Sequence, residues 1–288
     1  MRVLLFGAGG QVGRAVAATA PQRHEVIAKT RAELDIADER SVQRLLAEVK
    51  PDWIVNAAAY TAVDLAEDQP AQATAINDTA VGTLAYGAAG AGSRLLHLST
   101  DFVFDGRSGR AYLPTDATQP LGVYGASKLG GETQVLQSGA DGIVLRTAWV
   151  YAADGRNFVL TMLKLLRERD EVKVVADQIG APTWATGLAR AIWALLDARV
   201  PAGIYHWTDL GVASWYDFAV AIQEEARARG LLGNAARIVP ISSAEYPTRA
   251  RRPAFSVLDT SATRALVAAP AAHWRHNLRM MLDELRTA

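Results

Sequence analysis

The chain has 288 residues, of which 50% are hydrophobic and 21% are charged. This length suffices for one large α/β domain or for two smaller ones, and the composition is typical of a folded protein with a sizeable core. Lys and Arg together number 30, as do Asp and Glu, so no charge excess indicates nucleic acid or an anionic membrane as a partner.

The chain contains no cysteine, which excludes disulfides, thiolate catalysis and cysteine-ligated metals. The apolar run Val3–Phe6 ends at Gly7, which is far too short for the core of a secretion signal. No uninterrupted apolar run approaches the roughly 20 residues that a membrane span needs. We therefore expect a cytoplasmic protein that binds neither nucleic acid nor membrane.

The N-terminal segment has the pattern of strand, glycine-rich turn and helix. Val3–Phe6 is a predicted buried strand, the glycines that follow have the spacing G-x-x-G-x-x-G, and an alanine-rich helix begins at Arg14 and ends near Ala20. Such glycines let the backbone approach a pyrophosphate held at the helix N-terminus. The context favours a dinucleotide site over a glycine turn without a ligand. The predicted cofactor contacts here are Gly7, Gly10, Gln11, Val12 and Gly13.

Glu25–Ala28 is a predicted second strand, and Lys29-Thr30-Arg31 follows it. A free ribose 2′-hydroxyl usually meets an acidic residue near this strand end, whereas a 2′-phosphate prefers Arg or Lys. No acidic residue occurs before Glu33, which favours NADPH, with NADH as the alternative because surface cations are often only solvated. The predicted cofactor contacts in this region are Thr30, Arg31, Asp35 and Ile36.

Trp53–Asn56 is a predicted third strand that ends in small residues, which allow a cofactor to lie close, although helix packing also uses alanine. Ala57, Ala58 and Ala59 are therefore further predicted cofactor contacts. Residues 70–91 are predicted to form one long helix that contains Asn77.

Arg94–Leu98 is a predicted fourth strand, and Ser99-Thr100-Asp101 stands at its carboxyl end, where open parallel sheets bind ligands. Further on, Tyr124 and Lys128 share one face of a helix that runs to Leu136. An ammonium beside a phenol lowers a pKa that is ordinarily about 10, which makes a general acid or base. Each signal alone has a common structural explanation, a cap or a solvated helix face. Together they predict a catalytic group of Thr100, Tyr124 and Lys128.

After a predicted fifth strand at Gly142–Arg146, the regular alternation of strands and helices loosens. Helices are predicted at about 157–168, 186–197, 214–229 and 273–286, and short strands near 172–176, 204–206 and 238–240. The predicted fold is α/β: a Rossmann-type doubly wound parallel sheet over residues 1–150, with a smaller C-terminal α/β substrate domain over 151–288. Segments at about 177–200 are expected to return to the first domain, and a substrate is expected in the cleft between the two.

These motifs, in this order, resemble the extended short-chain dehydrogenase/reductase family and, within it, the dTDP-4-dehydrorhamnose reductase family. The resemblance runs through nearly the whole chain. The glycine loop and the Tyr-x-x-x-Lys motif indicate only the wider family. The segments Asp177–Thr183 and Arg252–Ser256 indicate the narrower one.

The resemblance implies reduction of the C4 keto group of dTDP-4-dehydrorhamnose to dTDP-L-rhamnose, the last step of dTDP-rhamnose synthesis. Tyr124 would protonate the developing alkoxide, Lys128 would hold the cofactor ribose and lower the phenol pKa, and Thr100 would orient the sugar oxygen. Arg252 could pair with nucleotide phosphates, although Arg249 and Arg251 compete for that role. Trp149 could instead be a core aromatic. The implied substrate contacts are Thr61, Val63, Asp64, Thr100, Val103, Trp149, Asn157, Arg252 and Ser256.

The chain also departs from the family pattern. Some members dimerise around Mg²⁺ held by three glutamates, and the matching positions here are Ala15, Thr186 and Glu284. A hard cation needs several oxygen ligands, so we expect no metal site and either a monomer or a weak homodimer. Pro114-Thr115-Asp116 stands where the family usually has a glutamate, in the segment that leads into the catalytic helix. The resemblance therefore does not define the loop on the substrate side.

Two other functions stay open at this point. An epimerase or dehydratase of the same superfamily would retain NAD⁺, and a dehydratase would want an acid beside Thr100. Asp101 occupies that place, but Phe102 follows it where a glutamate would be expected. A non-catalytic regulatory subunit of the same fold is disfavoured, because the catalytic group is intact.

Overall fold

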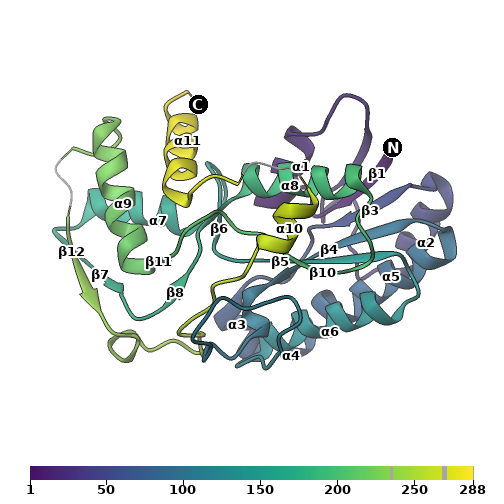
Figure 1. Cartoon of the computed structure of the whole chain (residues 1–288), viewed down its shortest axis with the longest axis horizontal. Helices are drawn as coiled ribbons and strands as arrows, with labels where there is room; N and C mark the ends of the chain where they lie inside the picture. Colours follow the sequence, from purple (N-terminus) through teal and green to yellow (C-terminus); the bar gives the residue numbers. More distant parts are fainter. Residues whose placement is uncertain (234–235, 268–270, 288) are drawn as a thin grey trace.

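The computed structural model describes residues 1–233, 236–267 and 271–287. Its centre is a six-stranded sheet in the order β10-β5-β4-β3-β1-β2, and every neighbouring pair is parallel (Figure 1). The predicted Rossmann-type parallel sheet is thus confirmed. The strands are β1 (Arg2–Phe6), β2 (Glu25–Lys29), β3 (Trp53–Asn56), β4 (Arg94–Thr100), β5 (Gly142–Thr147) and β10 (Gly203–His206).

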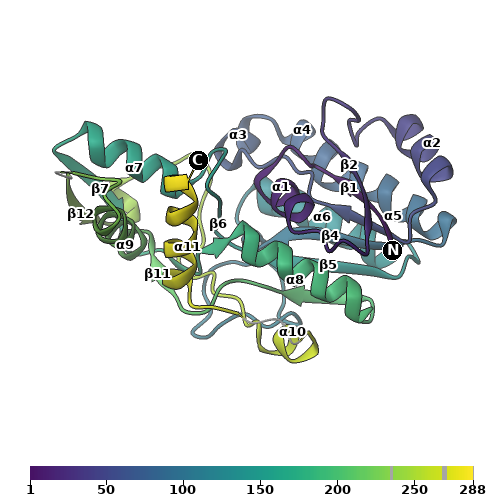
Figure 2. The same ribbon diagram turned by 90° about the horizontal axis from the view of Figure 1, so that it is seen from above.

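Helices cover both faces of this sheet, which is why its strands are almost continuously apolar (Figure 2). Along β1, Val3 and Leu5 point into a core shared with α8 (Ala185–Ala198), and α1 (Gln11–Ala18) packs on α8. Leu4 and Phe6 point to the opposite face, where α2 (Glu39–Val49) and α5 (Ala80–Ala91) cover them. The alternation follows from the two-residue period of a strand.

Two features of the N-terminal half differ from the predictions. Helix α2 was not predicted, although Val42, Leu46 and Val49 have helical spacing and the Asp38 side chain caps the helix by accepting from the Ser41 amide at 3.1 Å. The predicted helix over 70–91 is divided into α4 (Pro70–Thr74), a π-helical segment at Ala75–Thr79, and α5. A short helix α3 (Val63–Asp68) precedes it.

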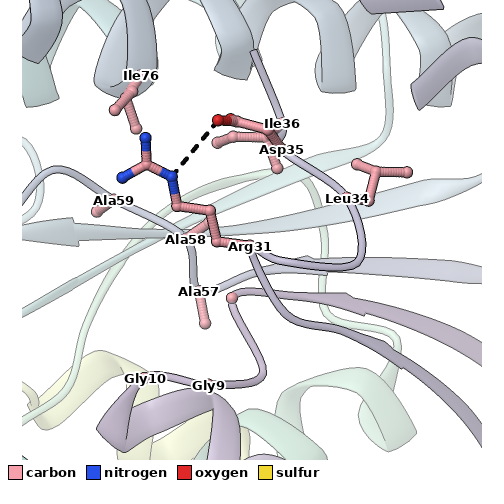
Figure 3. A pocket seen from close by; sticks show the side chains of 11 residues that line it. Gly9, Gly10, Arg31, Leu34, Asp35, Ile36, Ala57, Ala58, Ala59 and Ile76 are labelled. Atoms are coloured by element: carbon pink, nitrogen blue, oxygen red, sulfur yellow. Dashed lines mark ion pairs between the residues drawn. The ribbon is translucent and has the colours of Figure 1, made fainter. Parts of the chain in front are cut away.

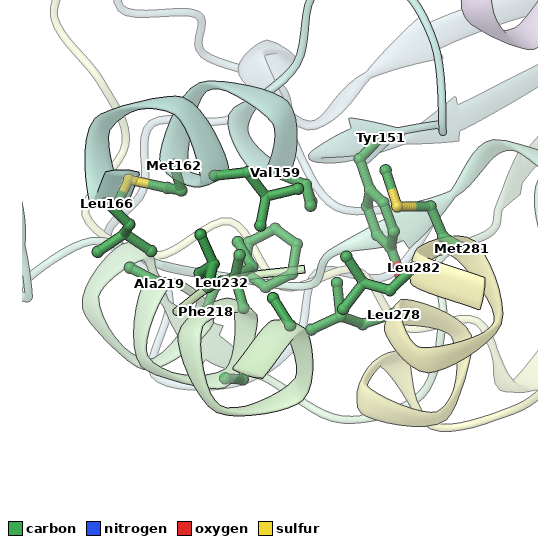
Figure 4. Close-up of a cluster of buried hydrophobic side chains, with 14 of the residues drawn as sticks. Tyr151, Val159, Met162, Leu166, Phe218, Ala219, Leu232, Leu278, Met281 and Leu282 are labelled. Atoms are coloured by element: carbon green, nitrogen blue, oxygen red, sulfur yellow. The ribbon is translucent and has the colours of Figure 1, made fainter. Parts of the chain in front are cut away.

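The C-terminal part has its own core, built where α7 (Phe158–Glu168), α9 (Trp215–Ala228) and α11 (Trp274–Thr287) meet (Figure 4). Phe218 and Leu278 lie fully buried in it. Strand β7 (Glu171–Val175) pairs in parallel with β12 (Arg237–Ile241). The remaining elements are β6 (Val150–Tyr151) paired with β9 (Thr183–Trp184), β8 (Ile179–Gly180) paired with β11 (Ala213–Ser214), and α10 (Ser261–Leu266).

The chain passes between these two parts more than once. After β9 in the C-terminal part, the chain returns to the large sheet and forms α8, which packs on it. The next strand, β10, pairs with β5 and is the sixth strand of that sheet. The strand predicted near 204–206 therefore belongs to the large sheet. Within the described ranges, no helix has the length and apolarity required to cross a membrane.

Candidate active site

The strand order reverses between β1 and β3, so the loops after these strands diverge and leave a crevice at the carboxyl edge of the sheet. A cavity of about 200 Å³ lies there (Figure 3). Most predicted cofactor contacts line it, namely Gly7, Gly10, Arg31, Asp35, Ile36, Ala57, Ala58 and Ala59. Gly9, Leu34 and Ile76 line it as well and were not predicted. Gly9 and Leu34 adjoin predicted residues, whereas nothing in the sequence singles out Ile76.

The glycine loop is tight in two places where a side chain could not fit. Gly7 has a φ of +76°, and a Cβ on it would lie 2.4 Å from the Ala58 nitrogen. A Cβ on Gly13 would lie 2.1 Å from the Gly7 carbonyl oxygen. These close approaches bring the first turn of α1, with its free amide groups, against the loop that follows β3. That arrangement suits an anionic group at the helix N-terminus.

Gln11 and Thr30 were also predicted as cofactor contacts but do not line this cavity. The Gln11 side chain donates to the Arg156 carbonyl at 3.3 Å and accepts from Asn157 at 2.9 Å. Thr30 donates from both its amide and its hydroxyl to Glu33, at 2.8 and 2.7 Å. Arg31 reaches across the cavity towards Asp35, with the two charged groups 3.4 Å apart and exposed to solvent (Figure 3). An exposed pair of this kind is weak, so Arg31 can turn to another anion.

Tyr124 is held in place by the start of α6 (Val123–Gln137). The carboxylate of Glu67 on α3 accepts from the Val123 amide at 2.9 Å and so caps the helix, in which Gly122 offers no side chain. Gly125 lets α6 approach closely, because a Cβ there would lie 2.2 Å from the Phe102 carbonyl oxygen. The Phe102 ring meets the Tyr124 ring edge-on, with centroids 5.5 Å apart.

Thr100 ends β4 next to this helix. Its hydroxyl accepts from the Phe102 amide at 3.2 Å and donates to the Asp101 carboxylate at 3.1 Å. Burial raises the pKa of Asp101 to about 6, against hydrogen bonds from Ser256 and Thr100 that lower it. A buried carboxyl with a raised pKa therefore stands directly beside Thr100, and Ser256 from the C-terminal part reaches the same group.

The pKa of Tyr124 is shifted in the direction opposite to the expected lowering. Burial raises the pKa of Tyr124 to about 12, the Asp101 charge raises it further, and only a hydrogen bond with Thr100 lowers it. The Lys128 amino group donates to the Leu98 carbonyl at 2.6 Å and lies 3.2 Å from His97 Nε2. Burial lowers the pKa of Lys128 itself to about 8, against the charge of Glu132.

Asn77 is a buried residue at this site that was predicted only as part of a helix. It lies in the π-helical segment, a feature often found at functional sites. Its amide oxygen accepts from the Tyr60 amide at 2.8 Å, and its nitrogen donates to the Tyr60 carbonyl and the Ser127 hydroxyl, each at 3.0 Å. Asn77 thus joins the loop after β3 to the turn of α6 that carries Lys128.

A buried ion pair anchors the same helix from behind. Glu132 on α6 and Arg146 on β5 are 2.6 Å apart, and both side chains are 2% exposed. Glu132 also accepts from Ser99, the residue before Thr100. The pair therefore links the strand that carries Thr100 to the helix that carries Tyr124 and Lys128.

A second cavity, of about 300 Å³, lies in the C-terminal part between α7, β7 and the segment around residues 246–252. Of the predicted substrate contacts, Arg252 lines it. Trp149 lies nearby, stacked on the cavity residue Trp215 with centroids 3.5 Å apart and with a left-handed φ of +47°. The sequence did not indicate the remaining lining residues, which are Phe158, Thr161, Met162, Leu165, Val172–Val175, Gln178, Trp215, Tyr246 and Thr248.

The other predicted substrate contacts have varied surroundings. Thr61 is exposed, and Val63 and Asp64 are partly exposed at the start of α3. Val103 is completely buried in a small core cluster, which leaves its side chain no surface for a ligand. The Asn157 side chain caps α7 by accepting from the Leu160 amide at 3.1 Å, and its nitrogen donates to Gln11. Both observations weigh against a substrate contact by Val103 or Asn157.

The residues at the family's magnesium positions do not fit that ion. Only Glu284 among Ala15, Thr186 and Glu284 carries a carboxylate. In the part of the chain that the structure describes, no group of three or more His, Cys, Asp or Glu side chains is arranged to hold a metal.

Comparisons with known proteins agree with this site. The family described as "RmlD substrate binding domain" matches residues 1–287. A dTDP-4-dehydrorhamnose reductase of Burkholderia thailandensis is 43% identical over 297 residues, which cover 99% of each chain. The structure of a dTDP-4-dehydrorhamnose reductase from Clostridium acetobutylicum has a TM-score of 0.93 at 36% identity, over 99% of this chain and 100% of that one. That from Bacillus anthracis, in complex with NADP, has a TM-score of 0.93 at 32% identity, over 98% and 99%.

Proposed function

This chain belongs to the RmlD substrate binding domain family, and from that premise we propose that it reduces the C4 keto group of dTDP-4-dehydrorhamnose to dTDP-L-rhamnose with NADPH. This is the last step of dTDP-rhamnose synthesis. The observation that carries the proposal is that Tyr124 hydrogen-bonds with Thr100 at the carboxyl end of β4, on the helix that also carries Lys128. The same edge of the sheet holds a glycine loop shaped for a dinucleotide.

Tyr124 is the proton donor of the reaction. When bound, the dinucleotide supplies hydride to the sugar carbon, and the carbonyl oxygen becomes an alkoxide that needs a proton. The raised pKa of Tyr124 keeps the phenol protonated before the reaction. Thr100, fixed by the Phe102 amide, orients the sugar oxygen, and general acid help of this kind contributes roughly 10²–10⁴-fold to the rate.

NADPH is preferred over NADH because of the residues after β2. The 2′-phosphate would meet Thr30 and Arg31, and the exposed pairing of Arg31 with Asp35 leaves the guanidinium able to turn. The Thr30 position carries no carboxylate of its own for a 2′-hydroxyl. Lys128 would hold the ribose, and Gly7, Gly10 and Ala57–Ala59 would let the cofactor lie close to the backbone.

The substrate would span the cleft from Tyr124 to the second cavity, with its nucleotide in the C-terminal part. Arg252 and the aromatic residues of that cavity suit a diphosphate and a base, respectively. In this assignment, residues 1–150 bind the cofactor, and residues 151–288 mainly bind the substrate. Since two of the three carboxylates that hold Mg²⁺ in other family members are absent, we propose that the protein binds no magnesium and is a monomer or a weak homodimer. We also propose that it is located in the cytoplasm.

The test follows the absorbance of reduced nicotinamide while purified protein meets NADPH and enzymatically prepared dTDP-4-dehydrorhamnose. Oxidation of NADPH and appearance of dTDP-L-rhamnose are expected. If neither NADPH nor NADH is oxidised, the proposed reaction is refuted, and tightly retained NAD⁺ in the purified protein would then indicate an epimerase or dehydratase.

A further inference from the structure

His97 is a buried residue that the reaction as described does not use. It lies on β4, three residues before Thr100, and is 0% exposed. Its ring stands between Asn56 at the end of β3 and Lys128 on α6, with Nδ1 3.1 Å from Asn56 Nδ2 and Nε2 3.2 Å from Lys128 Nζ. Gly131 on α6 leaves room for the ring, because a Cβ there would lie 3.3 Å from His97 Nε2.

The Asn56 amide fixes which atoms donate and which accept in the hydrogen bonds that connect Asn56, His97 and Lys128. Its oxygen accepts from the Ala58 amide at 3.0 Å, so its nitrogen is the atom that faces His97. A carboxamide nitrogen can only donate, and His97 Nδ1 must therefore accept. Rotating the Asn56 amide would set its nitrogen against the Ala58 N–H, two donors facing each other.

A neutral imidazole that accepts at Nδ1 carries its proton on Nε2. His97 is neutral, since burial lowers its pKa well below the ordinary value. The Nε2–H group therefore points at Lys128 Nζ. An ammonium has only donors and would oppose it, whereas an uncharged amine has a lone pair that accepts from His97 and still donates to the Leu98 carbonyl.

We propose that His97 is a positioning residue which disfavours the ammonium form of Lys128 until the cofactor binds, so that cofactor binding is accompanied by proton uptake at Lys128. The proton comes from solvent, and no other bond changes. Ribose hydroxyls offer acceptors that the ammonium can donate to, so protonation and binding favour each other reciprocally. This inference rests on the proposed role of Lys128 in holding the cofactor.

The surroundings of Lys128 support this account. Glu132, one turn further along α6, raises the pKa of Lys128, but its own charge is shared with Arg146 at 2.6 Å. Tyr124, one turn earlier, is a neutral phenol with a raised pKa. On the other sides, Asn56 from β3 and Asn77 with Ser127 contribute only uncharged groups. Lys128 would become a charged ammonium only when the cofactor binds. That charge would then lower the pKa of Tyr124.

The first test is the ¹⁵N spectrum of histidine-labelled protein without cofactor, with His97 assigned by comparison with His97→Gln. We expect a pyridine-type signal from Nδ1 and a pyrrole-type signal from Nε2. The opposite tautomer overturns the inference. This measurement needs neither cofactor nor activity, so its outcome is independent of the proposed function.

The second test is calorimetric titration with NADPH in buffers of different ionisation enthalpy, compared with Asn56→Asp. The introduced carboxylate still accepts from the Ala58 amide, but it also accepts from His97 Nδ1–H. His97 then carries its proton on Nδ1, and its Nε2 can accept a hydrogen bond from the ammonium of Lys128. We expect the native protein to take up about half a proton at pH 8 and more at pH 9, and the variant to take up almost none.

NADH, which lacks the 2′-phosphate, is the second titrant and separates proton uptake by that phosphate from uptake at Lys128. Equal uptake by the native protein and Asn56→Asp, with both proteins binding, overturns the inference. Absence of any cofactor binding to the native protein refutes the proposed function instead. If Asn56→Asp does not fold, the tautomer of His97 in the native protein decides the question.

Discussion

The Asp64 carboxylate and the Arg252 guanidinium are 2.8 Å apart, although 188 positions separate them in the sequence. Asp64 lies at the start of α3 beside the large sheet, and Arg252 lies on the C-terminal part and lines its cavity. A second pair, between Asp68 and Arg249, joins the same two segments. Two residues implied as substrate contacts therefore pair with each other and join α3 to the C-terminal part. An arriving diphosphate would compete with Asp64 for Arg252.

Arg252→Ala is expected to raise KM for the nucleotide sugar by about 10- to 100-fold, because a charge-assisted hydrogen bond contributes about 1.5–3 kcal/mol. The dissociation constant of NADPH should not change, since Arg252 is remote from the glycine loop. Arg251→Ala, at the exposed neighbouring position, is the matched control. Steady-state kinetics and cofactor titration of both variants check this, and equal effects of the two substitutions would contradict it.

Tyr124→Phe is expected to lower kcat by roughly 10²–10⁴-fold, because it removes the proton donor and leaves the ring in place. The edge-on contact with Phe102 does not involve the hydroxyl, so the helix should keep its position. NADPH fluorescence titration should give a dissociation constant close to that of the native protein. A variant that retained native kcat would show that another group supplies the proton.

Gly13→Ala is expected to abolish cofactor binding and to lower the melting temperature, since the added Cβ would lie 2.1 Å from the Gly7 carbonyl oxygen. Backbone on both sides leaves no easy relaxation. Gly90→Ala on α5 is the control, because a Cβ there meets nothing within 4 Å. That control should gain up to about 1 kcal/mol from helix propensity. Thermal unfolding with and without NADPH is measured for both variants. A Gly13→Ala protein with the native melting temperature and native NADPH binding would contradict the predicted clash with Gly7.

Asp209 makes stability depend on pH. Burial raises the pKa of Asp209 to about 7, against hydrogen bonds from Asn277 and from the Trp184 amide at 3.0 Å. Because this pKa lies above the ordinary 3.8, the folded state binds the proton more tightly than the unfolded state. The contribution is fully present below about pH 4 and is lost as the pH rises through 7, by up to about 1.4 kcal/mol per pH unit.

Asp209→Asn should therefore change little in stability between about pH 5 and 8, apart from changes common to both proteins. The free energy of unfolding of the native protein relative to this variant should fall over the same range. Urea denaturation at several pH values measures the difference. Parallel curves for the two proteins would show that Asp209 does not titrate in this window.

The Glu132–Arg146 pair is expected to behave as a unit. Arg146→Met alone leaves a buried carboxylate without its partner, at a cost of about 3–5 kcal/mol. The double variant Glu132→Leu with Arg146→Met removes both charges and should recover much of that loss. A double-mutant cycle in urea tests this, and additive losses would contradict it.

Much of the site could be predicted from short stretches of sequence. The spacing of Gly7, Gly10 and Gly13 after an apolar strand, and that of Tyr124 and Lys128 on a helix, are patterns set by covalent distance and backbone period. Such patterns need no knowledge of distant contacts. The parallel sheet followed from apolar strands alternating with helical segments, for the same reason.

Only the tertiary structure decided how distant segments meet. Residues 203–206 read as a short strand, but only packing shows that β10 completes the large sheet. Likewise, nothing near Lys128 in the sequence reveals that its amino group turns inward to Leu98 and His97. The helix period fixes which side of α6 carries Lys128. The donors, acceptors and burial that set the direction and pKa of its amino group come from strands that the fold brings beside it.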